Sequence, residues 1–458
     1  MWIGQHRKEV ERMTIAAKIA DFTLKTSYDT VPYNVKELAK KALIDYIAVT
    51  NIGSKEKSAE IMKRYVFGKP QNDECKAIGT DGYCNMEDAA LMNGYFAHLL
   101  DYDDVGLAGH PSAVLLSTCF AMGEPMEISG KKLMAAYIIG YEVSLKLAEA
   151  LMPELTEKGW HGTPIFGTIG AAVCAGKIMK LSKENLIDAI GIAASMASGI
   201  MENFGTHTKP FHAGMAASNG IKAVKLAKEG LKASPIAIEG ECGYARLFAH
   251  KKIKKNDVRF GECWELFLQD LMLKKYPCCS AAHTAINGIE ELIEDNNIDY
   301  KNIKKIVVSV PKFTLLNLIY EAPKTPEQAR FSMQYALACV LVTNKFDINS
   351  FSVHTLNDKE IKNVMKKIIM KEGECFIETP YIDNEPAVID LYTLDGRYYN
   401  KRIDFAKGNI KNPFTEEELE EKFFLCLGKR TLKNEKFLED LKAIEKIPDV
   451  KFFLGMNM

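Results

Sequence analysis

Residues 93–112 read NGYFAHLLDYDDVGLAGHPS, a helix-forming run that ends in aspartates and continues as a loop with glycines. The aspartates are Asp101, Asp103 and Asp104, and His110 follows in the same loop. Ionised carboxylates are rarely buried without partners, so one interpretation is a helix end with solvated aspartates. The other is a loop, held by helices, that supplies acid/base or cation-binding groups. The remaining sequence favours the second interpretation.

The length and composition of the chain limit its class. At 458 residues it is longer than one ordinary core, so we expect two domains. Hydrophobic residues make up 47% and charged residues 26%, which is typical of a soluble globular protein. The net charge is −1 without a basic block, so no nucleic-acid partner is expected. The charged N-terminus does not resemble a secretion signal, and no uncharged apolar stretch of about 18 residues occurs, so we expect no membrane association.

The eleven cysteines are scattered along the chain. Their odd number and the missing secretion signal indicate reduced thiols and a cytoplasmic protein. No Cys-x-x-Cys motif occurs, and the adjacent Cys278 and Cys279 are poorly placed to bind one ion. We therefore expect no metal.

The first 265 residues have the pattern of packed helices. Apolar residues recur at helical spacing in residues 8–25 and 35–52. Asn85 and Ser129 are suited to cap the two helices that they precede. Small residues recur along residues 166–227, which allows helices to approach closely.

The composition changes near residue 265. The β-branched run IKKIVVSV at 303–310 predicts a strand, and helices are expected near 281–294 and 329–343. Further strands are expected at 374–378, 386–393 and 397–404, the last two joined by a turn at Asp395-Gly396. From residue 414 the pattern is helical again.

The expected fold is therefore mainly α, with a large all-helical domain and an inserted, smaller α+β lid domain. We expect the domain limits to be 1–265 for the first part of the helical domain, 266–405 for the lid and 406–458 for C-terminal helices that return to the helical domain.

Four predicted loops bounded by Gly or Pro carry most of the ionisable residues of interest, and they span 101–110, 159–163, 205–212 and 274–279. Together they offer Asp101, His110, His161, Lys209 and Lys274. Lysines can neutralise substrate carboxylates, and histidines can move a proton near neutral pH. No phosphate-binding glycine loop and no Gly-x-Ser-x-Gly elbow occur. This pattern favours metal-free proton chemistry on a small polyanionic acid.

The loop at 205–212 has a second interpretation. Pro210 is expected to end helical continuity there. His207 and His212 are five residues apart, a spacing that does not place two zinc ligands on one helix face. A basic surface loop is the alternative to a site.

These residues carry a resemblance to the MmgE/PrpD family, which includes 2-methylcitrate dehydratase, cis-aconitate decarboxylase and iminodisuccinate epimerase. The segments that carry it are NGYFAHLLDYDDV with GHPS, GWHGTPIFGTIGAA, GTHTKPFHAGMAA, KKYPCCSAAH and EQARFSMQYALA. The resemblance implies an all-helical domain with an α+β lid, a homodimer and no cofactor. It also implies that the active-site set is Asp101, His110, His161, Lys209 and Lys274. We expect Lys209, Lys274, His212 and Cys279 to contact the substrate.

Two positions depart from the pattern of the family. Some members carry a threonine directly after the aspartates, where this chain has Val105. Members of the decarboxylase type carry a histidine two residues after the lid proline, where this chain has Cys279. Cys279 could be a base of low pKa beside Lys274 or an inert packed thiol. The second departure weakens the decarboxylase interpretation.

We therefore expect a lyase that dehydrates a small citrate-like di- or tricarboxylic acid, by removing a proton next to a carboxylate. An epimerase of a dicarboxylate is the alternative, and a decarboxylase or a non-catalytic binding protein is less favoured. We expect His161 and His110 to share the acid/base work, with Asp101 orienting one histidine. One histidine is expected to be charged and the other neutral.

Overall fold

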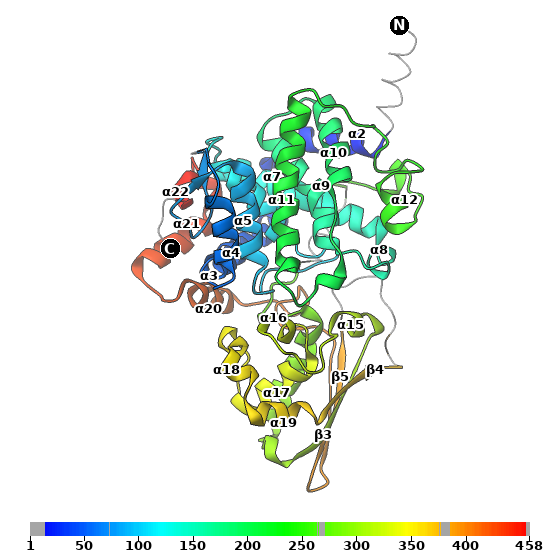
Figure 1. The fold of residues 1–458 in the computed structure, drawn as a ribbon, viewed down its shortest axis with the longest axis vertical. Helices are drawn as coiled ribbons and strands as arrows, with labels where there is room; N and C mark the ends of the chain where they lie inside the picture. The colour runs from blue at the N-terminus through cyan, green and yellow to red at the C-terminus, as the bar shows by residue number, and fades with distance from the viewer. Residues whose placement is uncertain are drawn as a thin grey trace.

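The structure, a computed structural model, describes residues 14–72, 74–262, 264, 271–374, 376 and 385–454. In Figure 1 a large helical body lies above a smaller body that contains a β-sheet. The longer helices of the large body are α2 (Ile15–Lys25), α3 (Tyr33–Gly53), α4 (Ala59–Phe67), α5 (Met86–His98), α6 (Pro111–Gly123), α7 (Gly130–Leu151), α9 (Gly162–Ile178), α10 (Lys183–Met196), α11 (Thr208–Lys228), α20 (Glu416–Leu427) and α21 (Leu432–Lys442). Its shorter elements are α8 (Glu154–Glu157), α12 (Tyr244–Ala249), α22 (Lys451–Leu454), β1 (Cys75–Lys76) and β2 (Tyr83–Cys84).

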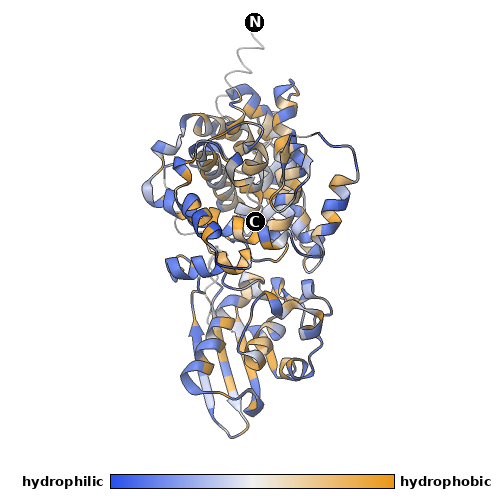
Figure 2. Ribbon diagram, turned by 90° about the vertical axis from the view of Figure 1, so that its left-hand side faces the viewer, coloured by the Kyte–Doolittle hydropathy of each residue, from blue (hydrophilic) through white to orange (hydrophobic). Residues whose placement is uncertain are grey.

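Local sequence explains where these helices start and how closely they pack. The side chains of Asn85 and Ser129 cap α5 and α7, which confirms both caps expected from the sequence. Small residues allow α5 and α11 to meet, because a Cβ atom on Gly94 would lie 2.7 Å from the Cα atom of Gly214. Figure 2 shows hydrophobic and hydrophilic residues alternating along many helices, as expected where one helix face is buried.

The lid contains a four-stranded sheet in the order β4-β3-β5-β6, formed by β3 (Ile303–Val310), β4 (Ile368–Glu372), β5 (Ala387–Thr393) and β6 (Tyr398–Ile403). The pair β3–β4 is parallel and the other pairs are antiparallel. Its helices are α14 (His283–Asn296), α15 (Lys312–Asn317), α16 (Pro326–Ala329), α17 (Met333–Thr343), α18 (Val353–Leu356) and α19 (Lys359–Met365). The β5–β6 hairpin turns at Gly396, whose φ of +88° suits a residue without a side chain.

Two hydrophobic cores underlie these two bodies. The first contains residues from Ile15 to Leu273 and again from Leu419 to Phe453, and the second runs from Tyr276 to Leu391. The chain therefore changes core between Leu273 and Tyr276, a few residues after the limit expected at 265. The helices α20 and α21 pack on α3, although they are the last long helices of the chain (Figure 1). The fold is mainly α with a small sheet, as expected.

Several expected elements differ from the observed ones. The segment 205–212 is not a loop throughout, because α11 begins at Thr208 and Pro210 lies in its first turn, where no helical N–H is lost. The helix expected at 329–343 is interrupted after α16. Glu374 and Phe376 are not in a strand, and the rest of 374–378 lies partly outside the described residues, whereas β4 was not expected. Residues 8–13 of the first expected helix also lie outside the described residues.

Nothing in the described ranges forms a helix that is long and apolar enough to cross a membrane.

Candidate active site

Asp101 lies in the loop that joins α5 to α6, and its side chain is held by cations. Its Oδ1 atom lies 2.7 Å from Nζ of Lys209 and 3.2 Å from Nζ of Lys274. Nε2 of His110 lies 3.6 Å from the same oxygen. Burial alone would raise the pKa of Asp101, but the two ammonium groups hold that pKa well below its ordinary value. Asp101 is therefore an ionised carboxylate in a buried position.

The backbone around Asp101 is also fixed by cations, and Asp101 itself has a φ of +50°. The carbonyl of Leu100 accepts a hydrogen bond from Nη1 of Arg330 at 2.9 Å. The carbonyl of Asp101 accepts from Nζ of Lys274 at 3.0 Å, and that of Tyr102 from Nζ of Lys422 at 2.9 Å. Three consecutive carbonyls thus each have a cationic donor, which stabilises a left-handed conformation that is uncommon outside glycine.

Asp103 lies between two histidines. Its carboxylate oxygens are 3.0 Å from Nδ1 of His98, and Oδ2 is 3.2 Å from Nδ1 of His110. On its other side, Nε2 of His98 accepts a hydrogen bond from Nζ of Lys209 at 2.8 Å. Asp103 therefore orients both imidazoles, and His98 links it to Lys209.

Asp104 is the third aspartate of the loop, and it lies beneath the site. Its Oδ2 atom accepts a hydrogen bond from Oγ of Ser112 at 2.5 Å, and that hydroxyl also lies 2.7 Å from the hydroxyl of Tyr137. Burial raises the pKa of Asp104 well above its ordinary value, although the hydrogen bond from Ser112 opposes this shift. Of the three aspartates, only Asp101 lines the cavity.

His161 precedes α9 and lies against His212 of α11. Their Nδ1 atoms are 3.1 Å apart, so one ring must donate a hydrogen bond and the other accept it. Burial lowers the pKa of His161 well below its ordinary value and lowers that of His212 to about 4. It also lowers the pKa of His110 to about 3, although Asp103 opposes this shift. The expectation that one catalytic histidine is charged is therefore wrong for the free protein, because burial outweighs the neighbouring carboxylates.

The two lysines differ in their surroundings. Lys209, in the first turn of α11, lies over the rings of Phe204 and Phe331, with Nζ 5.4 Å and 5.2 Å from their centroids. Burial lowers the pKa of Lys209, whereas for Lys274 burial is outweighed by Asp101 and Asp103, which raise its pKa. Lys274 lies at the connection between the two cores and has no exposed surface.

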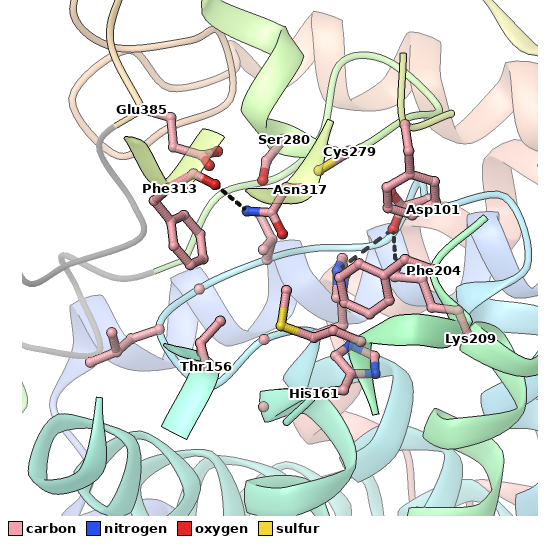
Figure 3. A pocket seen from close by; sticks show the side chains of 18 of the residues that line it. Asp101, Thr156, His161, Phe204, Lys209, Cys279, Ser280, Phe313, Asn317 and Glu385 are labelled. Carbon is pink, nitrogen blue, oxygen red and sulfur yellow. Dashed lines mark hydrogen bonds and ion pairs between the residues drawn. The ribbon is translucent and has the colours of Figure 1, made fainter. Parts of the chain in front are cut away.

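These side chains surround a cavity between the two domains with an empty volume of about 580 Å³, shown in Figure 3. Five of its lining residues are Asp101, His110, His161, Lys209 and Lys274, and Cys279 is a sixth. His212 is not part of this lining and lies behind His161. Burial raises the pKa of the Cys279 thiol to about 12, so the interpretation of Cys279 as a base of low pKa is wrong.

The cavity also contains residues that the sequence analysis missed. The lid provides Ser280, Phe313, Asn317, Phe331 and Glu385, and Figure 3 shows several of them facing Asp101 and His161 across the cavity. No motif marks Phe313, Asn317 or Glu385, whereas Ser280 and Phe331 lie within two of the segments that carry the family resemblance and were not singled out. His98 could have been identified as a candidate site residue from the sequence, because it lies three residues before Asp101, in the last turn of α5.

Four side chains, those of His98, Asp101, Asp103 and His110, come within 4.8 Å of one another and could in principle hold a metal ion. Both nitrogens of His98 already have polar partners, Asp103 and Lys209. A cation bound to Asp101 would also lie next to the ammonium groups of Lys209 and Lys274. This charge arrangement suits an anion better than a metal.

The site is thus a buried cluster of lysines, histidines and an ionised carboxylate between a helical domain and a smaller lid. Residues 17–256 match the MmgE/PrpD N-terminal domain, and residues 276–444 match the MmgE/PrpD C-terminal domain. The chain therefore belongs to the MmgE/PrpD family.

Its relatives include proteins named as cis-aconitate decarboxylases. The human protein is 31% identical over 354 residues, which cover 73% of this chain and 71% of the relative. The mouse protein is 27% identical over 382 residues, covering 79% and 76%. The protein of Aspergillus terreus is 24% identical over 465 residues, covering 95% and 94%.

Proposed function

We propose that this protein is a lyase that acts on a small citrate-like polycarboxylic acid in the cavity between its two domains. The observation that carries the proposal is the arrangement of Lys209, Lys274, His110 and His161 around one cavity, with Asp101 as the ionised partner of the two lysines. Ammonium groups in a buried site bind carboxylates strongly. Neutral histidines in the same cavity can accept a proton from carbon.

We propose dehydration as the reaction. A substrate carboxylate binds Lys209 and Lys274, which also stabilises negative charge that develops on that carboxylate. His161 removes the proton from the adjacent carbon, and the electron pair of the C–H bond forms the double bond. When the polyanion binds, His110 takes up a proton, and Asp103 orients its ring and stabilises this charged form. The hydroxyl group on the neighbouring carbon receives this proton from His110 and leaves as water, which returns His110 to its neutral form.

Decarboxylation is the second candidate. It is supported by relatives named cis-aconitate decarboxylases. Against it stands Cys279, which occupies a cavity position where decarboxylase-type members carry a histidine. A thiol whose pKa is raised to about 12 cannot replace a histidine as a proton carrier near neutral pH.

The test is an assay of the purified protein on citrate, 2-methylcitrate, the dicarboxylic hydroxy acid citramalate, and cis-aconitate, with three readouts. Dehydration produces alkene absorbance from the hydroxy acids, and decarboxylation releases carbon dioxide from cis-aconitate. Epimerisation would exchange a substrate proton with solvent deuterium without forming an alkene. The proposal predicts alkene formation. Carbon dioxide release without dehydration would replace it by the second candidate, and no turnover of any acid would refute both.

We further propose a cytoplasmic homodimer that needs no cofactor and no metal. Every cysteine that the structure describes is free, which suits a reducing compartment. The family resemblance is the support for the dimer, which we expect to form through the helical domain. Sedimentation at micromolar concentration would contradict the dimer if it gave a stable species of 51 kDa. Loss of activity in EDTA and its recovery with a divalent ion would contradict metal independence.

A further inference from the structure

Asn317 is the last residue of α15, in the lid, and its side chain lines the cavity. Only 8% of the residue is exposed. Its amide nitrogen Nδ2 donates a hydrogen bond to the backbone carbonyl of Phe313 at 3.2 Å. Because a carbonyl can only accept, this bond fixes which atom of the amide faces Phe313 and turns Oδ1 the other way. Asn317 therefore presents a hydrogen-bond acceptor in a fixed orientation.

The oxygen Oδ1 of Asn317 faces the cavity. Figure 3 shows this atom pointing away from Phe313 and toward the part of the cavity where Asp101 and Lys209 lie. Within the described part of the chain, no side chain or backbone group donates a hydrogen bond to Oδ1. A largely buried acceptor without a donor costs free energy, so a ligand that supplies the donor gains affinity.

The carboxylates of a substrate do not suit this acceptor. An ionised carboxylate has no hydrogen to donate, whereas the ammonium groups of Lys209 and Lys274 are donors that suit it well. Ser280 also lines the cavity, but its hydroxyl can donate or accept and so distinguishes less between the two kinds of group. The substrate group that fits Oδ1 of Asn317 is a neutral donor such as a hydroxyl.

We propose that Asn317 is a specificity-determining residue that selects hydroxy acids, by accepting a hydrogen bond from the substrate hydroxyl. The carboxylates bind the two lysines, and the hydroxyl donates to Oδ1. A hydroxyl held in this way keeps its lone pairs available for the proton from His110. An unsaturated acid without a hydroxyl leaves Oδ1 without a donor. This inference rests on the proposed function and narrows its citrate-like substrate to acids that carry a hydroxyl group.

The test compares two hydroxy acids with the same acids lacking the hydroxyl, namely citrate with tricarballylate and citramalate with methylsuccinate. Calorimetry measures the dissociation constants for the wild type and for Asn317→Leu, which has a similar size but no acceptor. In at least one pair, the wild type should bind the hydroxy acid about tenfold more tightly than the acid without the hydroxyl. In Asn317→Leu this ratio should fall to about one, because the acceptor for the hydroxyl is lost.

Asn296→Leu is the matched control. Asn296 is the last residue of α14, and its Nδ2 atom donates in the same way to the carbonyl of Leu292, at 3.1 Å, but it does not line the cavity. This variant should keep the wild-type ratio, so the loss of a bond at a helix end cannot by itself explain the result.

Two results would overturn the inference. One is a wild-type ratio near one in both pairs, or no binding of either hydroxy acid, and the other is an unchanged ratio in a folded Asn317→Leu variant. The wild-type ratio needs no variant, so a folding defect cannot hide the answer. Since binding is measured separately from turnover, the expected ratio in a protein that dehydrates neither acid would refute the proposed lyase activity but not the selectivity.

Discussion

The helical domain and the lid line the same cavity with different kinds of residue. The helical domain provides the titratable groups Asp101, His110, His161 and Lys209, and each of these has at least one charged or titratable partner within 3.6 Å. The lid mainly provides side chains that define shape and polarity, including Ser280, Phe313, Asn317, Phe331 and Glu385. Lys274 lies at the connection between the two. We infer that the helical wall carries the chemistry and the lid wall selects the acid.

This contrast has a structural cause. Buried cations hold the part of the helical domain that lines the cavity. Two of them, Lys422 and Arg330, also connect the Asp101 loop to the start of the lid. Lys422 donates to the carbonyls of Tyr102 and Lys274, and Arg330 donates to those of Leu100 and Pro277. The lid lining includes apolar side chains such as Phe313, whose replacement should have less effect on the geometry of the acid/base groups. The predictions below test this division, from the largest expected effect to the smallest.

Replacing Lys422 by methionine should destabilise the protein most. Lys422 forms a buried ion pair of 2.6 Å with Asp45, and its removal leaves that carboxylate without its partner. The expected loss in free energy of unfolding is about 3–5 kcal/mol. Chemical denaturation measures it. Lys252→Met, which removes an ion pair with Glu241 in which both side chains are exposed, should have a far smaller effect. Equal losses of unfolding free energy in the two variants would contradict the claim that the buried ion pair of Lys422 stabilises the helical domain.

Replacing Lys209 by alanine should remove most of the turnover while the fold remains. The loss of one partner from a buried charge pair costs about 2–5 kcal/mol, so kcat/KM should fall on the order of 10³-fold. Steady-state kinetics on the best acid of the panel measures the loss. Lys222→Ala, an exposed lysine on the same helix, is the control and should behave as wild type. Unchanged kinetics in Lys209→Ala would show that Lys209 contributes neither to substrate binding nor to turnover.

Binding of the polycarboxylate should weaken as the pH rises. In the free protein His110 and His212 have pKa values of about 3 and 4, so both are neutral at pH 7. A bound polyanion favours imidazolium and raises these pKa values, so the complex takes up protons that the free site lacks. Between the free and the bound pKa, affinity should fall about tenfold per pH unit for each proton taken up. Calorimetry in two buffers of different protonation heat measures this uptake. An affinity for the polycarboxylate that increases with pH would contradict the predicted direction of this dependence.

The smallest effect is expected on the lid wall, for Phe313→Leu. A change between large apolar side chains usually costs less than about 1.5 kcal/mol, so KM should change by less than about tenfold. The rate constant kcat should remain close to that of the wild type, because Phe313 contacts no acid/base group by a polar bond. A large fall in kcat with unchanged KM would show that the lid wall also takes part in the chemistry.

Much of this arrangement could be predicted from the sequence, because it depends on local patterns. The mainly α fold with a small sheet follows from apolar spacing and β-branched runs, and five proposed site residues lie in short Gly- and Pro-flanked motifs. These residues do come together around one cavity, although their individual roles remain proposals.

The rest depends on three-dimensional packing. His98 and Asp103 form their network only because the turn after α5 brings Asp103 back beside the His98 ring. Glu385 and Phe313 come from lid segments that no motif marks. Burial also lowers the histidine pKa values, so the histidine that was expected to be charged is neutral in the free protein. Pro210 misled the prediction for 205–212, since proline both ends helices and occupies their first turn.

The division between the two walls is tested most directly by solvent-deuterium exchange of the substrate proton in His161→Ala. A general base typically contributes about 10²–10⁴-fold, so the exchange rate should fall by that factor while substrate affinity changes little. His110→Ala should lower kcat by a similar factor, whereas His354→Ala, an exposed histidine of the lid, should have no effect. The pH profile of kcat/KM in each variant identifies the group that is lost. Exchange at the wild-type rate in His161→Ala would show that His161 is not the base and would contradict the account.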